Sequence, residues 1–290
     1  MAEQLIIPKK IVIAFHPKIP EAVKEAVSIE GVMKERGLDV CSGLLDDAKL
    51  RQQVRNRDFD LLVALGGDGT MLRAAHLCAP EGVPILGINM GRVGFLYQLG
   101  RTDWQEYFTR LMEGNYWIER RMMLRAEHWR AGDALSNWHA LNEAVICRGQ
   151  YIRPVHISAS VDERLLTTYV ADGLIAATPT GSTAYALAAG GPILPPELRN
   201  ILLVPIAPHL SVDRAVVLSE GSTVSIQVHS DGGTVLSVDG QTPVHLEQKD
   251  IVRVRVGDFS AQFVRFGDPD YFYRNLTARM NENSTSGFPT

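Results

Sequence analysis

The sequence of 290 residues contains only three cysteines and no long apolar run. Cys41, Cys78 and Cys147 are too scattered for a disulfide framework and lack metal-ligand spacing, which predicts a reducing cytoplasm as the location. No stretch approaches the roughly 18–20 apolar residues of a membrane-spanning helix. The polar N-terminus, of mixed charge, does not match a secretory signal. We therefore expect a cytoplasmic protein without a membrane partner.

The chain also lacks a large excess of either positive or negative charge. The net charge is −4 and the two signs are evenly spread, which argues against a nucleic-acid partner. Hydrophobic residues make up 46% of the chain and charged residues 21%, so a disordered chain is excluded. The length suits two modest domains.

The first ninety residues alternate between strand-like and helix-like periodicity. Strands are expected at residues 10–15, 38–41, 60–65 and 83–89, and helices at residues 21–36, 46–56 and 71–78. This alternation predicts an α/β domain with a mainly parallel sheet covered on both faces.

From about residue 119 short strand-like runs, among them residues 139–147, follow one another, separated by turns such as Asp162-Glu163 and with one helical interruption at residues 183–189. This pattern predicts an antiparallel, sandwich-like domain, in which Asp258-Phe259-Ser260 is expected to be a turn between two strands. We predict domains at residues 1–118 and 119–270, with residues 271–290 beginning as a helix that packs back on the first domain and ending in a polar tail.

The sharpest motif is Gly66-Gly67-Asp68-Gly69-Thr70, which follows a buried strand and opens a helix. The carboxyl edge of a parallel sheet is where ligands bind in open α/β folds. The glycines permit close approach of a phosphate, and the helix N-terminus favours anions. A carboxylate among phosphates is useful if it holds a metal ion or removes a proton from a nucleophile. The alternative is a simple Gly/Asp turn. Walker, dinucleotide-fingerprint and protein-kinase signatures are missing.

A second motif runs from Asp172 to Tyr185, where a short apolar strand leads into small and hydroxyl residues and then a helix. Thr180, Ser182 and Thr183 are expected to act as donors and helix caps around a backbone that a ligand can approach. A capped helix after a strand is the simpler interpretation, but it does not account for so many small residues. The segment does not fit a serine nucleophile.

Three further features are ambiguous from the residues alone. Asn142 and Glu143 stand together at the start of a strand, on opposite faces unless the strand is irregular there. Asp239-Gly240-Gln241 is expected to be a hairpin turn, and His209 a surface or capping residue in a loop. No histidine has metal-ligand spacing, so we predict no metal site held by the protein.

Together these segments, with Asn89 to Leu96 and Gly190-Gly191-Pro192, resemble the NAD kinase family over roughly residues 60–275. The G-G-D-G-T motif alone is shared with other kinases, whereas the T-P-T-G-S-T-A-Y segment is specific. The resemblance implies a two-domain enzyme that transfers the terminal phosphate of ATP or polyphosphate to the 2′-hydroxyl of the adenosine ribose of NAD, giving NADP. It also implies a divalent metal, usually Mg²⁺, brought by the substrate, and a homodimer or homotetramer that shares residues between active sites.

The resemblance also implies roles for individual residues. Asp68 corresponds to the carboxylate that deprotonates the ribose hydroxyl, in a phosphate-donor domain. Residues implied in binding the nucleotides are Gly67, Gly69, Thr70, Phe95, Asn142, Glu143, Asp172, Thr183, Ala184, Tyr185 and His209. Many bacterial members carry Arg where this chain has Val170, which leaves the choice between NAD and NADH open. The alternatives are a lipid kinase with the same G-G-D-G-T motif and a dinucleotide sensor without catalysis.

Overall fold

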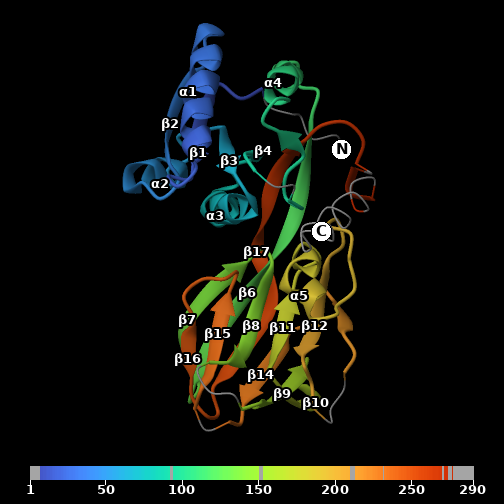
Figure 1. The fold of residues 1–290 in the computed structure, drawn as a ribbon. Helices are drawn as coiled ribbons and strands as arrows, with labels where there is room; N and C mark the ends of the chain where they lie inside the picture. The colour runs from blue at the N-terminus through green and yellow to red at the C-terminus, as the bar shows by residue number, and fades with distance from the viewer. Residues whose placement is uncertain are drawn as a thin grey trace, which may run out of the picture. The chain divides into compact units, whose positions relative to one another are not determined.

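The computed structural model describes residues 7–91, 94–149, 153–209, 213–230, 232–269, 271–273 and 276. The chain divides into two compact units (Figure 1). The first contains the described residues up to Arg120 and those from Ala261 onward, and the second contains Arg121–Ser260. The predicted second domain ends at residue 270, whereas residues from Ala261 onward lie in the first unit, because Phe263 pairs with Ile85 of its sheet.

The first unit is built on a parallel sheet with the order β2-β1-β3-β4. Its strands are β1 (Lys10–Phe15), β2 (Asp39–Leu44), β3 (Leu61–Gly66), β4 (Ile85–Asn89) and the short β5 (Leu99–Gly100). Its helices are α1 (Pro20–Glu35), α2 (Ala48–Arg55), α3 (Asp68–Cys78), the 3-10 turn η1 (Ala79–Glu81) and α4 (Trp104–Met112). The predicted α/β architecture is confirmed, but α4 was not anticipated from the sequence.

Helices cover both faces of this sheet, as the fully buried β3 requires (Figure 1). Helices α1 and α4 bury apolar side chains against Ile11, Ile13 and Val63 on one face. On the other face α2 reaches Gly43 of β2 through Leu50, and α3 reaches Gly87 of β4. The carboxyl end of β3 at Gly66 is followed almost directly by α3, which begins at Asp68.

The second unit consists of two antiparallel sheets. One contains β7 (Asp133–Ala140), β9 (Val155–Val161), β10 (Arg164–Ala171), β14 (Val224–Val228) and those parts of β6 (Trp117–Arg130) and β17 (Ile251–Arg265) that fall within Arg121–Ser260. The other has the order β13-β12-β11-β8-β15-β16, made of β8 (Glu143–Arg148), β11 (Gly173–Ala177), β12 (Asn200–Ile206), β13 (Val216–Ser219), β15 (Thr234–Val238) and β16 (Val244–Leu246). Apolar side chains of both sheets form one core, which confirms the predicted β-rich sandwich.

Two strand predictions were wrong in their continuity. The run predicted as one strand from His139 to Cys147 is broken between β7 and β8, where Asp239 binds the backbone. The turn predicted at Asp258 is instead inside the continuous strand β17, where Arg125 of β6 pairs with the Asp258 carboxylate. The helix predicted at residues 183–189 is a 3-10 turn η2 (Gly181–Thr183) followed by the short α5 (Tyr185–Ala188).

Residues 271–273 are helical and lie in the first unit. The Tyr271 hydroxyl donates a hydrogen bond to Glu119, so the start of the C-terminal segment packs on this unit as predicted. The rest of the predicted helix up to Met280 falls mostly outside the described residues, as does the polar tail. Within the described ranges no helix has the length and apolar character needed to cross a membrane.

Candidate functional site

The G-G-D-G-T motif forms the connection from β3 to α3. Gly67 is the N-cap residue of α3, and Asp68 lies in its first turn. Among the described residues, a Cβ placed on Gly67 or Gly69 would meet no atom within 4 Å, so this part of the structure leaves open space in front of both residues. Thr70 is different, because its side chain is 3% exposed and fills the space beside Gly66. The N–H groups of Thr70 and Met71 donate to the Gly67 carbonyl oxygen, so the donors that this helix end can offer to an anion are the N–H groups of Asp68 and Gly69.

The Asp68 carboxylate is held by the backbone of a segment far along the chain. Phe95 N–H donates to Oδ2 at 3.1 Å and Leu96 N–H to Oδ1 at 3.3 Å. A Cβ on Gly94 would lie 2.1 Å from Oδ1, so only glycine lets this backbone pass so close to the carboxylate. Asp68 and Phe95, predicted from distant motifs, are therefore in direct contact.

Tyr97 fixes the other side of the same turn. Its hydroxyl donates to the Gly67 carbonyl oxygen at 3.0 Å, and its side chain is 3% exposed. Burial, reinforced by the negative charge of Asp68, raises the pKa of Tyr97 well above its ordinary value. The phenol therefore stays protonated and keeps donating its hydrogen bond across the physiological pH range. Sequence reasoning missed Tyr97, which directly follows the Phe95-Leu96 pair.

In the second unit Asn142 and Glu143 lie at the break between β7 and β8. The Asp239 carboxylate accepts hydrogen bonds from three successive N–H groups, those of Leu141 at 2.6 Å and of Asn142 and Glu143 at 2.9 Å each. The strand is thus irregular where the two side chains stand, the condition under which they need not face opposite sides. Asp239 adopts a φ of +48° and positions this pair, whereas the sequence indicated only a hairpin turn.

Glu143 is 7% exposed, and its Oε2 has no hydrogen-bond partner within the described ranges of the chain. Burial, with a contribution from the charge of Asp239, raises the pKa of Glu143 to about 8, although the Tyr185 backbone N–H opposes the shift. At neutral pH the side chain is therefore mainly a neutral carboxylic acid, which can both donate and accept a hydrogen bond. Such a group can form hydrogen bonds with a sugar hydroxyl both as a donor and as an acceptor.

The loop after β11 is tied together by its own hydroxyl groups. Ser182 Oγ donates to the Pro179 carbonyl at 2.6 Å, and Thr183 Oγ1 donates to the Thr180 carbonyl at 3.1 Å. No side chain caps η2 or α5, so the expectation of helix caps was wrong: these hydroxyls bond the carbonyls of the preceding turn instead. A Cβ on Gly181 would lie 2.1 Å from the Asn142 carbonyl oxygen, so the loop packs tightly on the Asn142 backbone.

The structure brings Asn142, Glu143 and Tyr185 together but places Asp172 elsewhere. Glu143 aligns with Ala177 at one end of β11, while Asp172 directly precedes Gly173 at the other end, about 17 Å from Ala177 along the strand. The predicted residues at that end are Asp172 and the exposed His209, whose N–H donates to the Val170 carbonyl oxygen at 2.7 Å.

Asp172 has an ionic partner that the sequence did not indicate. Arg148 Nη2, from the last residue of β8, lies 2.9 Å from Asp172 Oδ2. Arg148 thus supplies an ionic contact to Asp172 from a neighbouring strand, although position 170 carries Val rather than Arg. No local pattern around Arg148 points to this pairing, because it depends on the register of β8 against β11.

A cavity of about 420 Å³ in the first unit lies away from this chemistry. Asp60, Leu61 and Pro84 line it, at the amino ends of β3 and β4 and so at the opposite edge of the sheet from Asp68. In the described part of the chain no three histidine, cysteine, aspartate or glutamate side chains gather as metal ligands would.

These features define a class of protein. The α/β unit presents a carboxylate at a helix N-terminus after two glycines, and the β-sandwich unit that follows contains a second polar site. This combination is typical of phosphotransferases with a G-G-D-G motif. Residues 11–116 match the family model described as the ATP-NAD kinase N-terminal domain, and residues 141–266 match the ATP-NAD kinase C-terminal domain. The chain belongs to the NAD kinase family, and it is an enzyme of that type.

Several relatives support this assignment over nearly the whole chain. An NAD kinase of Chloroflexus aurantiacus is 38% identical over 275 residues, covering 95% of this chain and 99% of the relative. One of Dehalococcoides mccartyi is 36% identical over 280 residues, covering 96% and 98%.

Solved structures agree with the sequence relatives. The crystal structure of yeast NADH kinase complexed with NADH has a TM-score of 0.84 at 25% identity, covering 98% of this chain and 91% of that one. An NAD kinase from Archaeoglobus fulgidus in complex with ATP has a TM-score of 0.74 at 26% identity, covering 94% and 98%. Neither a lipid kinase nor a sensor without catalysis is supported.

Proposed function

We propose that Asp68 is the general base of an ATP-dependent NAD kinase. The Asp68 carboxylate takes the proton from the 2′-hydroxyl of the adenosine ribose of NAD, whose oxygen then attacks the terminal phosphorus of ATP. ADP leaves, and the product is NADP. The observation that carries this proposal is the fixed carboxylate beside the open helix N-terminus, with Gly67 and Gly69 leaving room for phosphates.

The chemistry matches what phosphoryl transfer requires from a protein. Such enzymes chiefly align donor and acceptor and neutralise developing charge. A sugar hydroxyl is a poor nucleophile at neutral pH, and a positioned base contributes roughly 10²–10⁴-fold in rate. The N-terminus of α3 supplies partial positive charge and N–H donors for the phosphate chain. Thr70 is proposed to contribute by shaping the phosphate-facing turn, since its side chain is buried and its N–H donates to the Gly67 carbonyl oxygen.

The remaining residues are proposed to bind the dinucleotide. Asn142 and Glu143 contact the ribose, where the neutral Glu143 acid donates and accepts hydrogen bonds. Asp172 binds the nicotinamide half, and Phe95 packs near the adenine. Thr183, Ala184, Tyr185 and His209 are proposed to complete the binding surface; Tyr185 is 46% exposed and thus accessible to a ligand.

Mg²⁺ is proposed to enter with the phosphates of ATP. This ion keeps most of its waters and binds largely through substrate phosphates in kinase sites. It would offset negative charge on the terminal phosphate as the ribose oxygen approaches. The chain's own task at that point is to hold Asp68 and the helix N-terminus in place.

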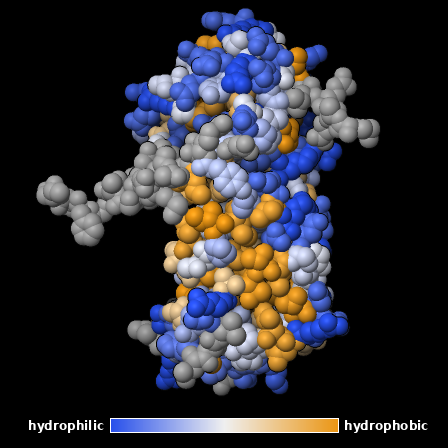
Figure 2. All heavy atoms as spheres, turned by 90° about the vertical axis from the view of Figure 1, so that its right-hand side faces the viewer, coloured by the Kyte–Doolittle hydropathy of each residue, from blue (hydrophilic) through white to orange (hydrophobic). Residues whose placement is uncertain are grey.

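A homodimer or homotetramer is proposed as the working assembly. Figure 2 shows apolar side chains gathered on one face of the second unit, in the lower half of the view. Val217 on the edge strand β13 is 47% exposed, and Leu198 is 40% exposed. The separation of Asp172 from Glu143 along β11 also favours a site that a second copy completes.

A cytoplasmic location is proposed as well. Cys41, Cys78 and Cys147 are all free thiols, as expected in a reducing compartment.

The test of the proposed base is Asp68→Asn in an assay that couples NADP to an NADP-specific dehydrogenase. We expect NADP formation to fall at least about 100-fold, while the variant folds and still binds NAD. Asp60→Asn is the matched control, because Asp60 precedes the same strand at its other end and its carboxylate accepts hydrogen bonds from the N–H groups of Lys9 and Lys10. Substantial NADP formation by Asp68→Asn would place the base elsewhere. Running the assay with ATP, polyphosphate, NAD and NADH in turn tests the donor and acceptor, with ATP and NAD expected to be used.

A further inference from the structure

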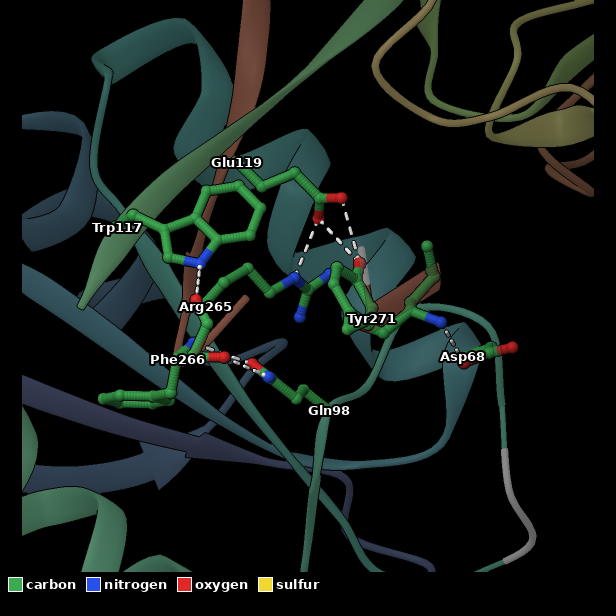
Figure 3. Close-up of polar contacts among 9 residues, drawn as sticks. Asp68, Gln98, Trp117, Glu119, Arg265, Phe266 and Tyr271 are labelled. Atoms are coloured by element: carbon green, nitrogen blue, oxygen red, sulfur yellow. Dashed lines mark hydrogen bonds and ion pairs between the residues drawn. The ribbon is translucent and has the colours of Figure 1, made fainter. Parts of the chain in front are cut away.

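A buried ion pair lies in the first unit, on the side of residues 95–98 away from the G-G-D-G-T turn. Arg265, the last residue of β17, is 1% exposed, and Glu119 of β6 is 6% exposed. Arg265 Nε donates to Glu119 Oε2 at 2.8 Å. The Tyr271 hydroxyl donates to Glu119 Oε1 at 2.9 Å, and the Tyr271 ring lies 5.2 Å from the guanidinium carbon. Figure 3 shows the Arg265 guanidinium and the Tyr271 hydroxyl both directed at the Glu119 carboxylate.

The same guanidinium reaches the segment that holds Asp68. Arg265 Nη2 donates to the Leu96 carbonyl oxygen at 3.1 Å. Leu96 therefore has its carbonyl fixed by Arg265 and its N–H bound to Asp68 Oδ1. Two bonds and one residue separate the buried guanidinium from the proposed base.

A second contact anchors the same segment to the end of β17. Gln98 Nε2 donates to the Phe266 carbonyl oxygen at 2.6 Å, and Phe266 N–H donates to Gln98 Oε1 at 2.9 Å (Figure 3). Residues 95–98 are thus held on one side by β17 and on the other by Gly67 and Asp68. Through residues 95–98, the position of the Asp68 carboxylate therefore depends on the position of β17.

Stability alone does not account for this arrangement. Removing two charges from water costs several kcal/mol per ion, and well-packed apolar residues are often as stabilising as a buried ion pair. A guanidinium supplies something that an apolar group lacks, namely a planar set of donors at fixed angles. Here one edge is directed at Glu119 and another nitrogen at the Leu96 carbonyl.

We propose that Arg265, oriented by Glu119 and Tyr271, is a positioning residue for Asp68, acting through the Leu96 backbone. The inference rests on the proposed role of Asp68 as the base. When the Leu96 carbonyl is held, the N–H groups of Phe95 and Leu96 stay directed at the carboxylate and keep it aligned for the ribose hydroxyl. Loss of the guanidinium lets this segment rotate and leaves the base misaligned, without removing a group that touches either substrate.

Arg265→Lys tests the geometry, because one ammonium cannot reproduce the two donors that the guanidinium directs at separate acceptors. We expect kcat to fall roughly 10–100-fold, the range for a misplacement of about 1 Å, while KM for ATP and NAD changes less than about threefold. Hydrogen exchange of the peptide containing residues 94–98 should accelerate selectively. The double variant E119Q/R265M leaves no unpaired buried charge, so it tests the same loss if the lysine variant fails to fold.

The matched control is R130M/D250N in the second unit, which removes another arginine–carboxylate pair, with Nε 2.8 Å from Oδ1 and the aspartate fully buried. This control should keep the wild-type kcat. A folded Arg265 variant with wild-type kcat, or one in which only KM rises, overturns the positioning role. Asp68→Asn in the same assay separates the two ideas: its inactivity beside an unaffected Arg265→Lys refutes only the positioning role, and its activity refutes the proposed base.

Discussion

Replacing Glu143 by glutamine should remove a pH dependence of folding that the buried carboxyl group imposes. Glutamine keeps the shape of the side chain but has no proton to lose. Glu143 is 7% exposed, lies near the charged Asp239 and has one oxygen without a partner. The folded protein therefore holds this carboxyl in its neutral form, whereas the unfolded chain lets it ionise.

The sign and size of the effect follow from the raised pKa. The pKa of Glu143 is about 8 in the folded state, against an ordinary value of 4.5. As pH rises, the unfolded chain loses this proton first, so the contribution of the neutral acid is complete below about pH 4.5 and is lost up to about pH 8. One pKa unit corresponds to about 1.4 kcal/mol, so the loss over this window is roughly 5 kcal/mol.

The assay is urea unfolding of the nucleotide-free protein at several pH values between about 5 and 8. Between these limits the free energy of unfolding of the wild type should fall by about 1 kcal/mol more per pH unit than that of Glu143→Gln. Glu197→Gln, at an exposed glutamate of the same unit, is the control, and its free energy of unfolding should change with pH as that of the wild type does. Parallel stability curves for wild type and Glu143→Gln would refute the reasoning, because they would show that the carboxyl ionises equally in both states.

Two further predictions concern the catalytic turn and the assembly. Gly94→Ala should lower kcat at least about tenfold, because its Cβ would lie 2.1 Å from Asp68 Oδ1. A Cβ on Gly91 would meet no atom of a described residue within 4 Å, so Gly91→Ala should leave the steady-state kinetics nearly unchanged. Val217→Glu should shift the proposed oligomer toward the monomer in light scattering, while Leu165→Glu, at a leucine 67% exposed on β10, should not. Equal kcat for the two alanine variants, or an unchanged mass for Val217→Glu, contradicts the corresponding prediction.

The parts of this protein that sequence reasoning predicted well are those carried by local patterns. The alternation of apolar runs and helical spacing identified β1 to β4 with α1 to α3, since each element's periodicity is contained within its own segment. The strand–glycine–helix order also located Asp68 at the amino end of α3. The turn at Asp162-Glu163 was likewise predicted, and both residues have positive φ.

The parts that failed depend on contacts between distant segments. The break between β7 and β8 exists because Asp239, almost a hundred residues away, binds three N–H groups there. The continuity of β17 through Asp258 depends on arginines of β6 and β17 that offset its charge. Arg148 beside Asp172 follows from the register of two strands, which no single segment encodes.

The two polar sites share one structural feature: a carboxylate accepts hydrogen bonds from successive backbone N–H groups of a remote segment. Asp68 binds those of Phe95 and Leu96, and Asp239 binds those of Leu141, Asn142 and Glu143. In the first case the carboxylate is the proposed reacting group, and in the second it shapes the backbone beside a neutral acid. Because phosphoryl transfer depends on alignment more than on covalent help from the protein, both arrangements serve the same requirement. Each fixes a functional side chain with backbone donors, which cannot rotate away as a side-chain donor can.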